Sequence, residues 1–209
     1  MNQGSQQGLS PPSQSALNQK ISAKTIKSNP NRVSQADIFC DLKIIERLSV
    51  IDSNLVLNEI AFPYLVCLSQ ECDLERDFEE SQKHDILPSP KRLIHLLFAP
   101  AFNFDDFLTG KHWGDLFEIS KSGKRRDTKI KAIIDNETPR YHYLRFSEID
   151  EVDGVKLPEL LIDFKHYFTI NRNCVYSDIS KRLCSIDDLF REKISQRFSY
   201  FISRIGLPE

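Results

Sequence analysis

Short apolar runs separated by polar breaks begin after position 36 and continue along most of the chain. The first runs lie at residues 42–45, 48–51 and 55–60, and each is strand-like in length and composition. A continuous apolar run follows Pro63 and covers residues 64–69. Such a run is typical of a central strand that is buried on both faces. The pattern therefore predicts a sheet.

Strand-like patterns return at residues 93–98 and 140–146, and the clearest alternation of apolar and polar positions runs from 161 to 170. The helical signals are fewer. Asn103 can cap a short helix through Leu108, and Gly110 offers a left-handed stop for it. At the C-terminal end, a capping-box-like start at 185–188 precedes apolar residues at helical spacing, up to Gly206 and Pro208.

Three segments lack a packing pattern. Residues 71–90 contain seven acids, two bases and two prolines, which favours a long exposed loop. Asp153 and Gly154 indicate a tight turn. Residues 1–35 are rich in Gln, Ser, Asn and Pro, so we expect a disordered polar tail.

These patterns predict one globular α+β domain at residues 36–209, behind the tail at residues 1–35. Its fold class is a strongly bent antiparallel sheet or small β-barrel with helical additions, closed by a long amphipathic C-terminal helix.

Charge and cysteine content limit the classes of protein to which this chain can belong. The tail carries four bases and no acid, so the net charge of −2 leaves about −6 on the domain, which argues against a surface that follows nucleic acid phosphates throughout. Five cysteines without a CxxC pair fit neither a disulfide framework nor a zinc ribbon. No apolar run approaches the roughly 20 residues of a membrane span, and a signal-peptide pattern is missing. We therefore expect a cytoplasmic protein with reduced thiols.

The best candidates for catalysis follow the predicted central strand. Ser69, Cys72 and Asp73 stand where a buried strand meets an exposed segment, a position that both orients and exposes side chains. Cys72 is the candidate nucleophile, and His95 or His166 would have to lower the pKa of its thiol. The alternative is a structural cysteine, with both histidines hydrogen-bonded in the core.

No known metal-binding spacing, glycine-rich phosphate loop or serine-hydrolase motif occurs, and seven glycines make a dinucleotide fold a poor match. We expect no metal and no cofactor. A basic stretch containing Lys124, Arg125 and Arg126, with Arg140 and Tyr141 beyond it, combines cations and aromatic rings as RNA-binding surfaces do. A solvated charged turn is the alternative.

Residues 64–70, a proline-led apolar strand that ends in a polar segment, resemble the second strand and following loop of PemK/MazF-type toxins, which are small barrels. The resemblance covers about residues 37–100. It implies acid–base cleavage of RNA, and Ser69 is the one position that it would carry over. The chain is about twice as long as such toxins and ends in an additional helix.

Three functional hypotheses follow. The first is a bacterial PemK/MazF-like barrel protein that binds RNA or a protein partner in a toxin, antiphage-defence or mobile-element setting, with ribonuclease activity as an option. The second is a cysteine-dependent hydrolase or transferase that uses Cys72. The third is a structural or interaction subunit without catalysis. We expect no membrane partner, and a homo-oligomer is compatible with all three.

Overall fold

The computed structural model describes residues 23, 25–26, 29–83, 89–113, 127–146, 151–152 and 155–204. The strands are β1 (Thr25–Ile26), β2 (Ile38–Ile51), β3 (Asn54–Cys67), β4 (His95–Asn103), β5 (Tyr141–Leu144), β6 (Glu151–Val152), β7 (Val155–Lys156), β8 (Leu160–Asp163), β9 (Phe168–Asn171) and β10 (Arg182–Ile186). The helices are α1 (Glu71–Ser81), α2 (Phe104–Thr109), α3 (Asp127–Ile134), α4 (Arg172–Ser177) and α5 (Asp188–Ile202), with 3-10 turns η2 (Phe164–His166) and η3 (Ile179–Lys181).

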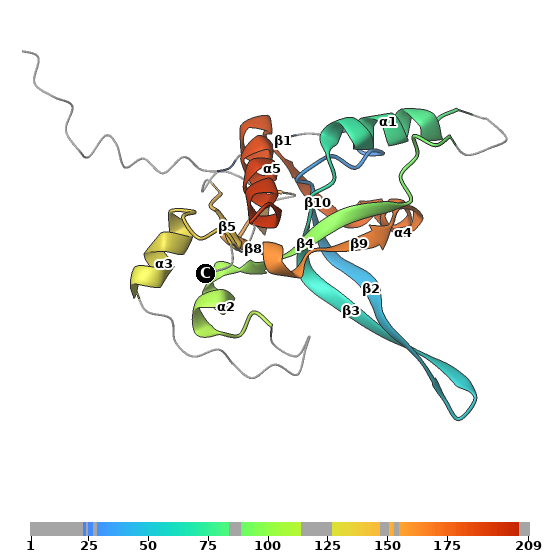
Figure 1. Cartoon of the computed structure of the whole chain (residues 1–209), viewed down its shortest axis with the longest axis horizontal. Coiled ribbons are helices and arrows are strands. Elements are labelled where there is room, and N and C mark those ends of the chain that lie inside the picture. Colours follow the sequence, from blue (N-terminus) through green and yellow to red (C-terminus); the bar gives the residue numbers. More distant parts are fainter. Residues whose placement is uncertain are drawn as a thin grey trace, which may run out of the picture.

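The main sheet has the strand order β1-β10-β2-β3-β4-β8-β5, and β9 also pairs with β4. All of its strand pairs are antiparallel. The sheet curls strongly into a half-barrel, and few helices surround it (Figure 1). The predicted α+β class, with a bent antiparallel sheet and a C-terminal helix, is confirmed.

The centre of the sheet is buried on both faces. Along the end of β3, Val66 packs into the cluster that contains Ile194 of α5, whereas Leu65 and Cys67 pack into the opposite cluster with Leu74 of α1. None of these side chains is exposed. The continuous apolar run therefore forms the central strand that the sequence predicts, because both of its faces need apolar side chains.

The C-terminal helix packs on one face of this sheet. Phe190, Ile194 and Phe198 of α5 are buried against the strands. The side chain of Asp187 caps the helix by accepting a hydrogen bond from the Leu189 amide at 3.0 Å. Ser185 lies in β10 instead of starting the helix. The predicted helix is thus confirmed, although its cap is Asp187 and it ends at Ile202 instead of continuing to Gly206.

The prediction of a long loop at 71–90 is wrong for its first half. Residues Glu71–Ser81 form α1, which covers the sheet with Leu74 fully buried (Figure 1). Asp77, one of the seven acids that suggested a loop, is also fully buried. Its carboxylate accepts a hydrogen bond from Arg172 Nε of α4 at 2.5 Å. A count of charges misses this helix because the neutralising base lies 95 positions away.

The single strand predicted at 161–170 is also wrong. The 3-10 turn η2 divides it into β8 and β9, which pair with different parts of β4. Asp163 starts this turn by accepting a hydrogen bond from the Lys165 amide at 3.1 Å. All four residues of β8 are buried, including Asp163, and only β9 keeps an alternation of exposed and less exposed positions. The sequence pattern runs through the turn without a break, so the sequence alone indicated one continuous strand.

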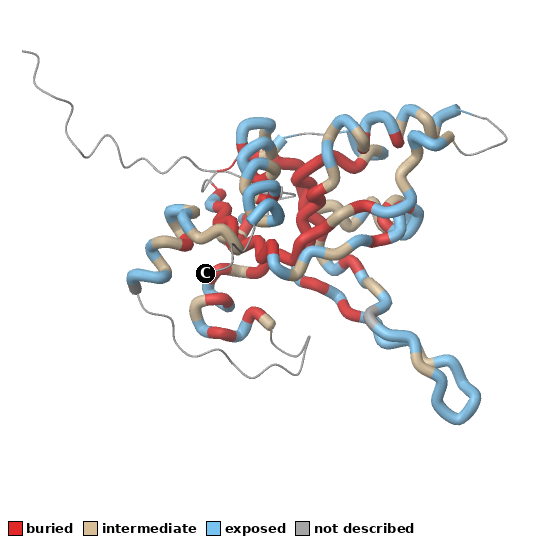
Figure 2. Tube along the Cα trace, viewed as in Figure 1, coloured by how far each residue is buried: buried red, intermediate tan, exposed pale blue. Residues whose placement is uncertain are grey.

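The apolar runs from 42 to 60 are not separate strands. They form the continuous hairpin β2–β3, whose turn contains Asp52 and Ser53 at positive φ angles of 50° and 64°. The distal part of this hairpin extends away from the rest of the described protein, and its residues are mostly exposed (Figures 1 and 2). We call residues 43–61 the arm.

Several local predictions hold. The Asn103 side chain caps α2 by accepting a hydrogen bond from the Asp105 amide at 2.9 Å, and Gly110 ends the helix at φ 75°. Such a φ angle favours glycine. Strand β5 lies inside the predicted segment 140–146. The predicted turn at 153–154 lies outside the described residues, between the paired strands β6 and β7.

The single-domain division stays a prediction, but residues before position 36 already pack on the sheet. Ala23 and Val33 are buried, and β1 pairs with β10. Glu71 of α1 holds this segment, because its carboxylate accepts hydrogen bonds from Arg32 Nη2 at 2.5 Å and from the Gln35 amide at 2.7 Å.

All five cysteines are free, and Cys72 and Cys174 are exposed. Among the described helices, none has both the length and the apolar character that crossing a membrane would need.

The buried Asp77–Arg172 pair predicts the stability of the α1–α4 contact. Arg172→Ala leaves a buried carboxylate without its partner and should lower the free energy of unfolding by about 3 kcal/mol. Lys43→Ala is the control, since its ion pair with Glu59 is exposed and should contribute less than about 0.5 kcal/mol. Urea unfolding measures both variants. Similar losses in the two would show that the buried pair does not hold α1 in place.

Candidate functional site

The predicted catalytic segment lies at the junction of β3 and α1. Ser69 is half-buried, and its Oγ accepts a hydrogen bond from the Leu97 amide of β4 at 2.8 Å. Cys72 is exposed in the first turn of α1, with its Sγ 3.9 Å from both Gln70 Oε1 and Asp73 Oδ1. The hydroxyl thus anchors the junction to the sheet, and the thiol stands beside acceptor oxygens.

Neither predicted histidine base hydrogen-bonds with these groups in the described part of the chain. His95 is exposed at the start of β4, where it pairs with Asn171. His166 lies in η2 and bonds with Asp163. The hypothesis of a catalytic Cys72 stays a prediction, and the described contacts give the thiol no imidazole partner.

The structure does bring together two residues that the sequence suggested for different roles. Arg140 donates two hydrogen bonds to the Asp163 carboxylate, from Nε at 2.8 Å and from Nη2 at 2.5 Å. His166 Nδ1 lies 3.1 Å from the same carboxylate. Asp163 itself is buried, and its hydrogen bonds raise the pKa of Arg140. These three residues form what we call the Asp163 centre.

This centre joins β5, β8 and η2, and an aromatic ring borders it. The ring of Trp113 packs edge-on against that of His166, with centroids 4.5 Å apart. Tyr141 is buried and packs edge-on against Phe107 of α2 at 5.2 Å. Arg140 and Tyr141 therefore already have intramolecular partners.

Lys124, Arg125 and Arg126 lie outside the described residues. The hypothesis of nucleic acid binding through the basic stretch consequently stays a prediction, and the described contacts of Arg140 and Tyr141 add no support to it.

The arm carries an apolar face that the sequence reasoning missed. Leu48 stands directly opposite Leu57, and Val50 opposite Leu55. A bulge at position 46 keeps Ile45 on the same face, across from Glu59. We call the five side chains of Ile45, Leu48, Val50, Leu55 and Leu57 the apolar face of the arm; each is between 50% and 70% exposed.

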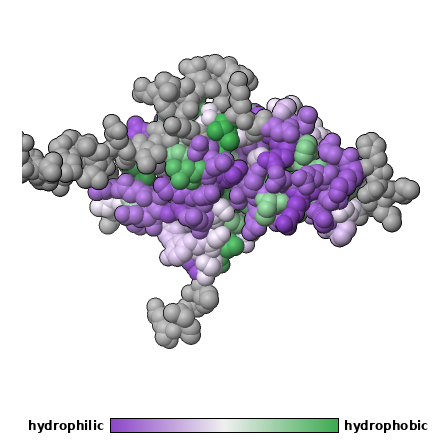
Figure 3. Space-filling view, turned by 90° about the horizontal axis from the view of Figure 1, so that it is seen from above, coloured by the Kyte–Doolittle hydropathy of each residue, from purple (hydrophilic) through white to green (hydrophobic). Residues whose placement is uncertain are grey.

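The five residues of the apolar face are neighbours on the paired strands of the arm. Figure 3 shows one face of the molecule that is largely hydrophilic, with small and separate hydrophobic patches. Scattered exposed apolar residues are ordinary, whereas a contiguous patch marks a contact site. The alternation within 45–57 could have revealed it, had the two strands been recognised as one hairpin.

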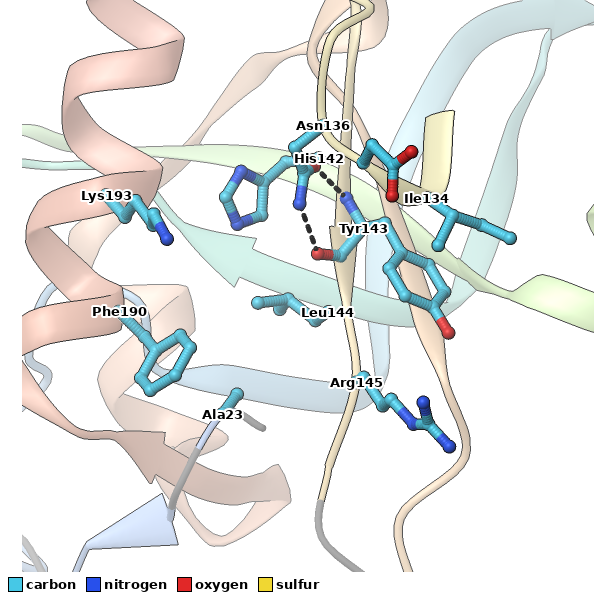
Figure 4. A pocket seen from close by; sticks show the side chains of 10 residues that line it. Ala23, Ile134, Asn136, His142, Tyr143, Leu144, Arg145, Phe190 and Lys193 are labelled. Carbon is cyan, nitrogen blue, oxygen red and sulfur yellow. Dashed lines mark hydrogen bonds between the residues drawn. The ribbon is translucent and has the colours of Figure 1, made fainter. Parts of the chain in front are cut away.

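A second missed feature is a cavity between β5 and α5, with a volume of about 310 Å³ (Figure 4). His142 lines it and is only 2% exposed, and its Nδ1 has no hydrogen-bond partner among the described residues. The sequence alone does not single out His142, because it stands between Tyr141 and Tyr143 like any other residue of a strand.

The imidazole of His142 is neutral under ordinary conditions. Burial lowers its pKa to about 3, and the nearby positive charges of Arg197 and Lys193 act in the same direction. Both cations belong to α5. A neutral imidazole offers one donor and one acceptor nitrogen, so this ring can bind a polar group without carrying charge.

Within the described residues, no group of three or more His, Cys, Asp and Glu side chains is placed to hold a metal ion. Comparisons of this chain with protein families, with curated proteins and with solved structures gave no match. The geometry of the described residues therefore carries the functional argument.

The buried His142 predicts an acid-sensitive fold. Its folded-state pKa of about 3 lies below the ordinary value of about 6.5, so the unfolded chain takes up a proton first as the pH falls. Stability is retained above about pH 6.5 and is lost progressively toward pH 3. Between pH 7.5 and pH 5 the loss from this residue should be roughly 2 kcal/mol.

Urea unfolding of His142→Gln at both pH values tests this assignment, because glutamine stays neutral throughout. The variant should lose about 2 kcal/mol less than the wild type between pH 7.5 and pH 5. His95→Gln, at an exposed position, is the matched control and should behave as the wild type. An unchanged pH dependence in His142→Gln would contradict the assignment.

Proposed function

We propose that this protein works by binding a protein partner through the apolar face of the arm, and that the partner is a second copy of this chain. The observation that carries the proposal is the contiguous exposure of five aliphatic side chains on a projecting hairpin. Burying each of them further would favour association by about 1 kcal/mol.

The charge of the arm favours a protein as its binding partner over RNA. Residues 43–61 contain two bases and three acids, and Lys43 already pairs with Glu59 at 3.3 Å. An RNA-binding arm would need an excess of cations to meet the phosphates. An apolar centre with mixed charges at its border is the usual composition of a protein interface.

The edges of the arm support pairing with an identical hairpin. Strand β10 pairs with β2 at Ile38 and Phe39, and β4 pairs with β3 at 64–67, so neither described neighbour reaches the arm. Exposed strand edges readily pair with another chain. Two arms related by a two-fold axis would present the same apolar face and the same open edges to each other.

This proposal selects the protein-binding part of the first hypothesis. Catalysis by Cys72 remains a prediction, because no described contact brings an imidazole to its thiol. RNA cleavage also remains a prediction, because Arg140 at the Asp163 centre is already paired with Asp163. A binding role requires neither.

A double variant of a cross-strand pair tests the proposal. Leu48→Lys with Leu57→Glu replaces the centre of the apolar face by an opposite-charge pair, which preserves the hairpin because such pairs stabilise neighbouring strands. We expect the wild type to dimerise with rising concentration in sedimentation velocity experiments. The variant should raise the dissociation constant of the dimer by about tenfold or more.

Ser49→Lys with Val56→Glu is the matched control, since this pair lies opposite on the other face of the arm. It should dimerise as the wild type does. Circular dichroism verifies that both variants keep their strands. A wild type that stays monomeric, or two variants with equal effects, would refute self-association through the apolar face.

A further inference from the structure

The cavity beside His142 combines hydrogen-bonded walls with polar groups that lack a partner among the described residues. Arg197 of α5 donates hydrogen bonds to the carbonyl oxygens of Thr138 and Tyr141, both at 2.9 Å, and to that of Asn136. This guanidinium fastens α5 to the segment that leads into β5. The cavity between them is therefore bordered by elements that are already joined to each other.

Asn136 fixes a further wall. It ends α3 at a positive φ of 57°, and its side-chain amide exchanges two hydrogen bonds with the Tyr143 backbone, at 2.7 and 3.0 Å. Asn136 thereby occupies the outer edge of β5 (Figure 4). The backbone at this side of the cavity is satisfied without a ligand.

Two polar groups of the cavity remain unsatisfied by described residues. His142 Nδ1 is buried without a hydrogen-bond partner, although buried polar atoms nearly always have one. The ammonium group of Lys193 forms no ion pair within the described part of the chain, whereas Arg145 pairs with Glu159 at 3.4 Å. Figure 4 shows Lys193 on the α5 side and His142 between it and β5.

The remaining lining is largely apolar and includes Ile134, Leu144 and Phe190. Asp135 also lines the cavity, and it already takes part in another interaction. A volume of about 310 Å³ corresponds to roughly ten non-hydrogen atoms, at about 30 Å³ for each water-sized unit. Such a site, with apolar walls and a few polar groups, has the usual composition of a small-molecule pocket.

We propose that this cavity binds a small organic carboxylate of about ten non-hydrogen atoms, whose apolar body lies against Leu144 and Phe190. The carboxylate contacts the ammonium group of Lys193 and accepts a hydrogen bond from the imidazole N–H of His142. Phosphate fits less well, because one lysine and a neutral imidazole do not balance a dianion and the walls offer it no apolar contact.

3-Phenylpropionate is a suitable probe, with 3-phenylpropanol as its neutral counterpart and inorganic phosphate as the anion without an apolar body. Calorimetric titration of the full chain should show saturable binding of the carboxylate, with an affinity at least about fivefold above that of the alcohol. Phosphate should not bind detectably. Equal binding of acid and alcohol, or binding of phosphate alone, would overturn the proposal.

Lys193→Gln locates the site. Because Lys193 is exposed, the variant should fold normally and weaken binding of 3-phenylpropionate by about fivefold. Lys43→Gln on the arm is the matched control and should leave the affinity unchanged. Equal affinities in the wild type and Lys193→Gln would refute the site.

A second readout does not depend on any variant. In NMR spectra of histidine side chains, the ring signal of His142 should shift saturably as 3-phenylpropionate is added, whereas that of His95 should stay in place. A His142 signal that does not move while the probe binds would place the ligand elsewhere and overturn the proposal. Neither readout involves the arm, so the outcome is independent of self-association.

Discussion

Burial of the central strands on both faces is the constraint on which this fold depends. The end of β3 and the facing part of β4 need apolar cover above and below, which α5 supplies on one face and α1 with α4 on the other. Strands β2 and β3 continue beyond this cover. The alternation of apolar residues that forms the core at the base of the hairpin continues along the arm. There the apolar side chains are exposed, and this exposure creates the proposed contact surface.

Buried carboxylates fasten the covering elements to the sheet. Asp77 pairs with Arg172 and joins α1 to α4, whereas Asp163 pairs with Arg140 and joins β8 to the start of β5. Asp37 accepts hydrogen bonds from the Ser34 amide at 2.8 Å and from Arg182 at 3.1 Å, yet burial still raises its pKa. The two residues of each ion pair lie at least 23 positions apart in sequence. Because the carboxylates are buried, removing the basic partner leaves an unpaired charge in the interior.

This arrangement changes how the charged residues are interpreted functionally. Arg140 was a candidate for nucleic acid contact and His166 a candidate base, and both contact Asp163. The apolar face of the arm and the cavity at His142 differ from these residues. Within the described protein, the aliphatic side chains of the arm are exposed, and His142 Nδ1 has no hydrogen-bond partner. Both features are the basis of the two binding roles proposed for this chain.

The sequence by itself determined the elements whose signals are local. The run at 64–69, the cap Asn103 with its helix, the apolar spacing of α5 and the left-handed Gly110 depend on neighbouring residues, and their patterns predicted a bent α+β fold. Only the tertiary structure decided that 71–81 is a helix, that 161–170 turns at Phe164–His166, and that the runs from 42 to 60 form one projecting hairpin. The helix at 71–81 depends on Arg172, which neutralises Asp77, and the turn at Phe164–His166 depends on the pairing of β8 and β9 with different parts of β4. The projecting hairpin depends on where the covering helices end. Partners that are distant along the chain leave no periodic signal, because periodicity records only which face of an element is apolar and not what meets that face.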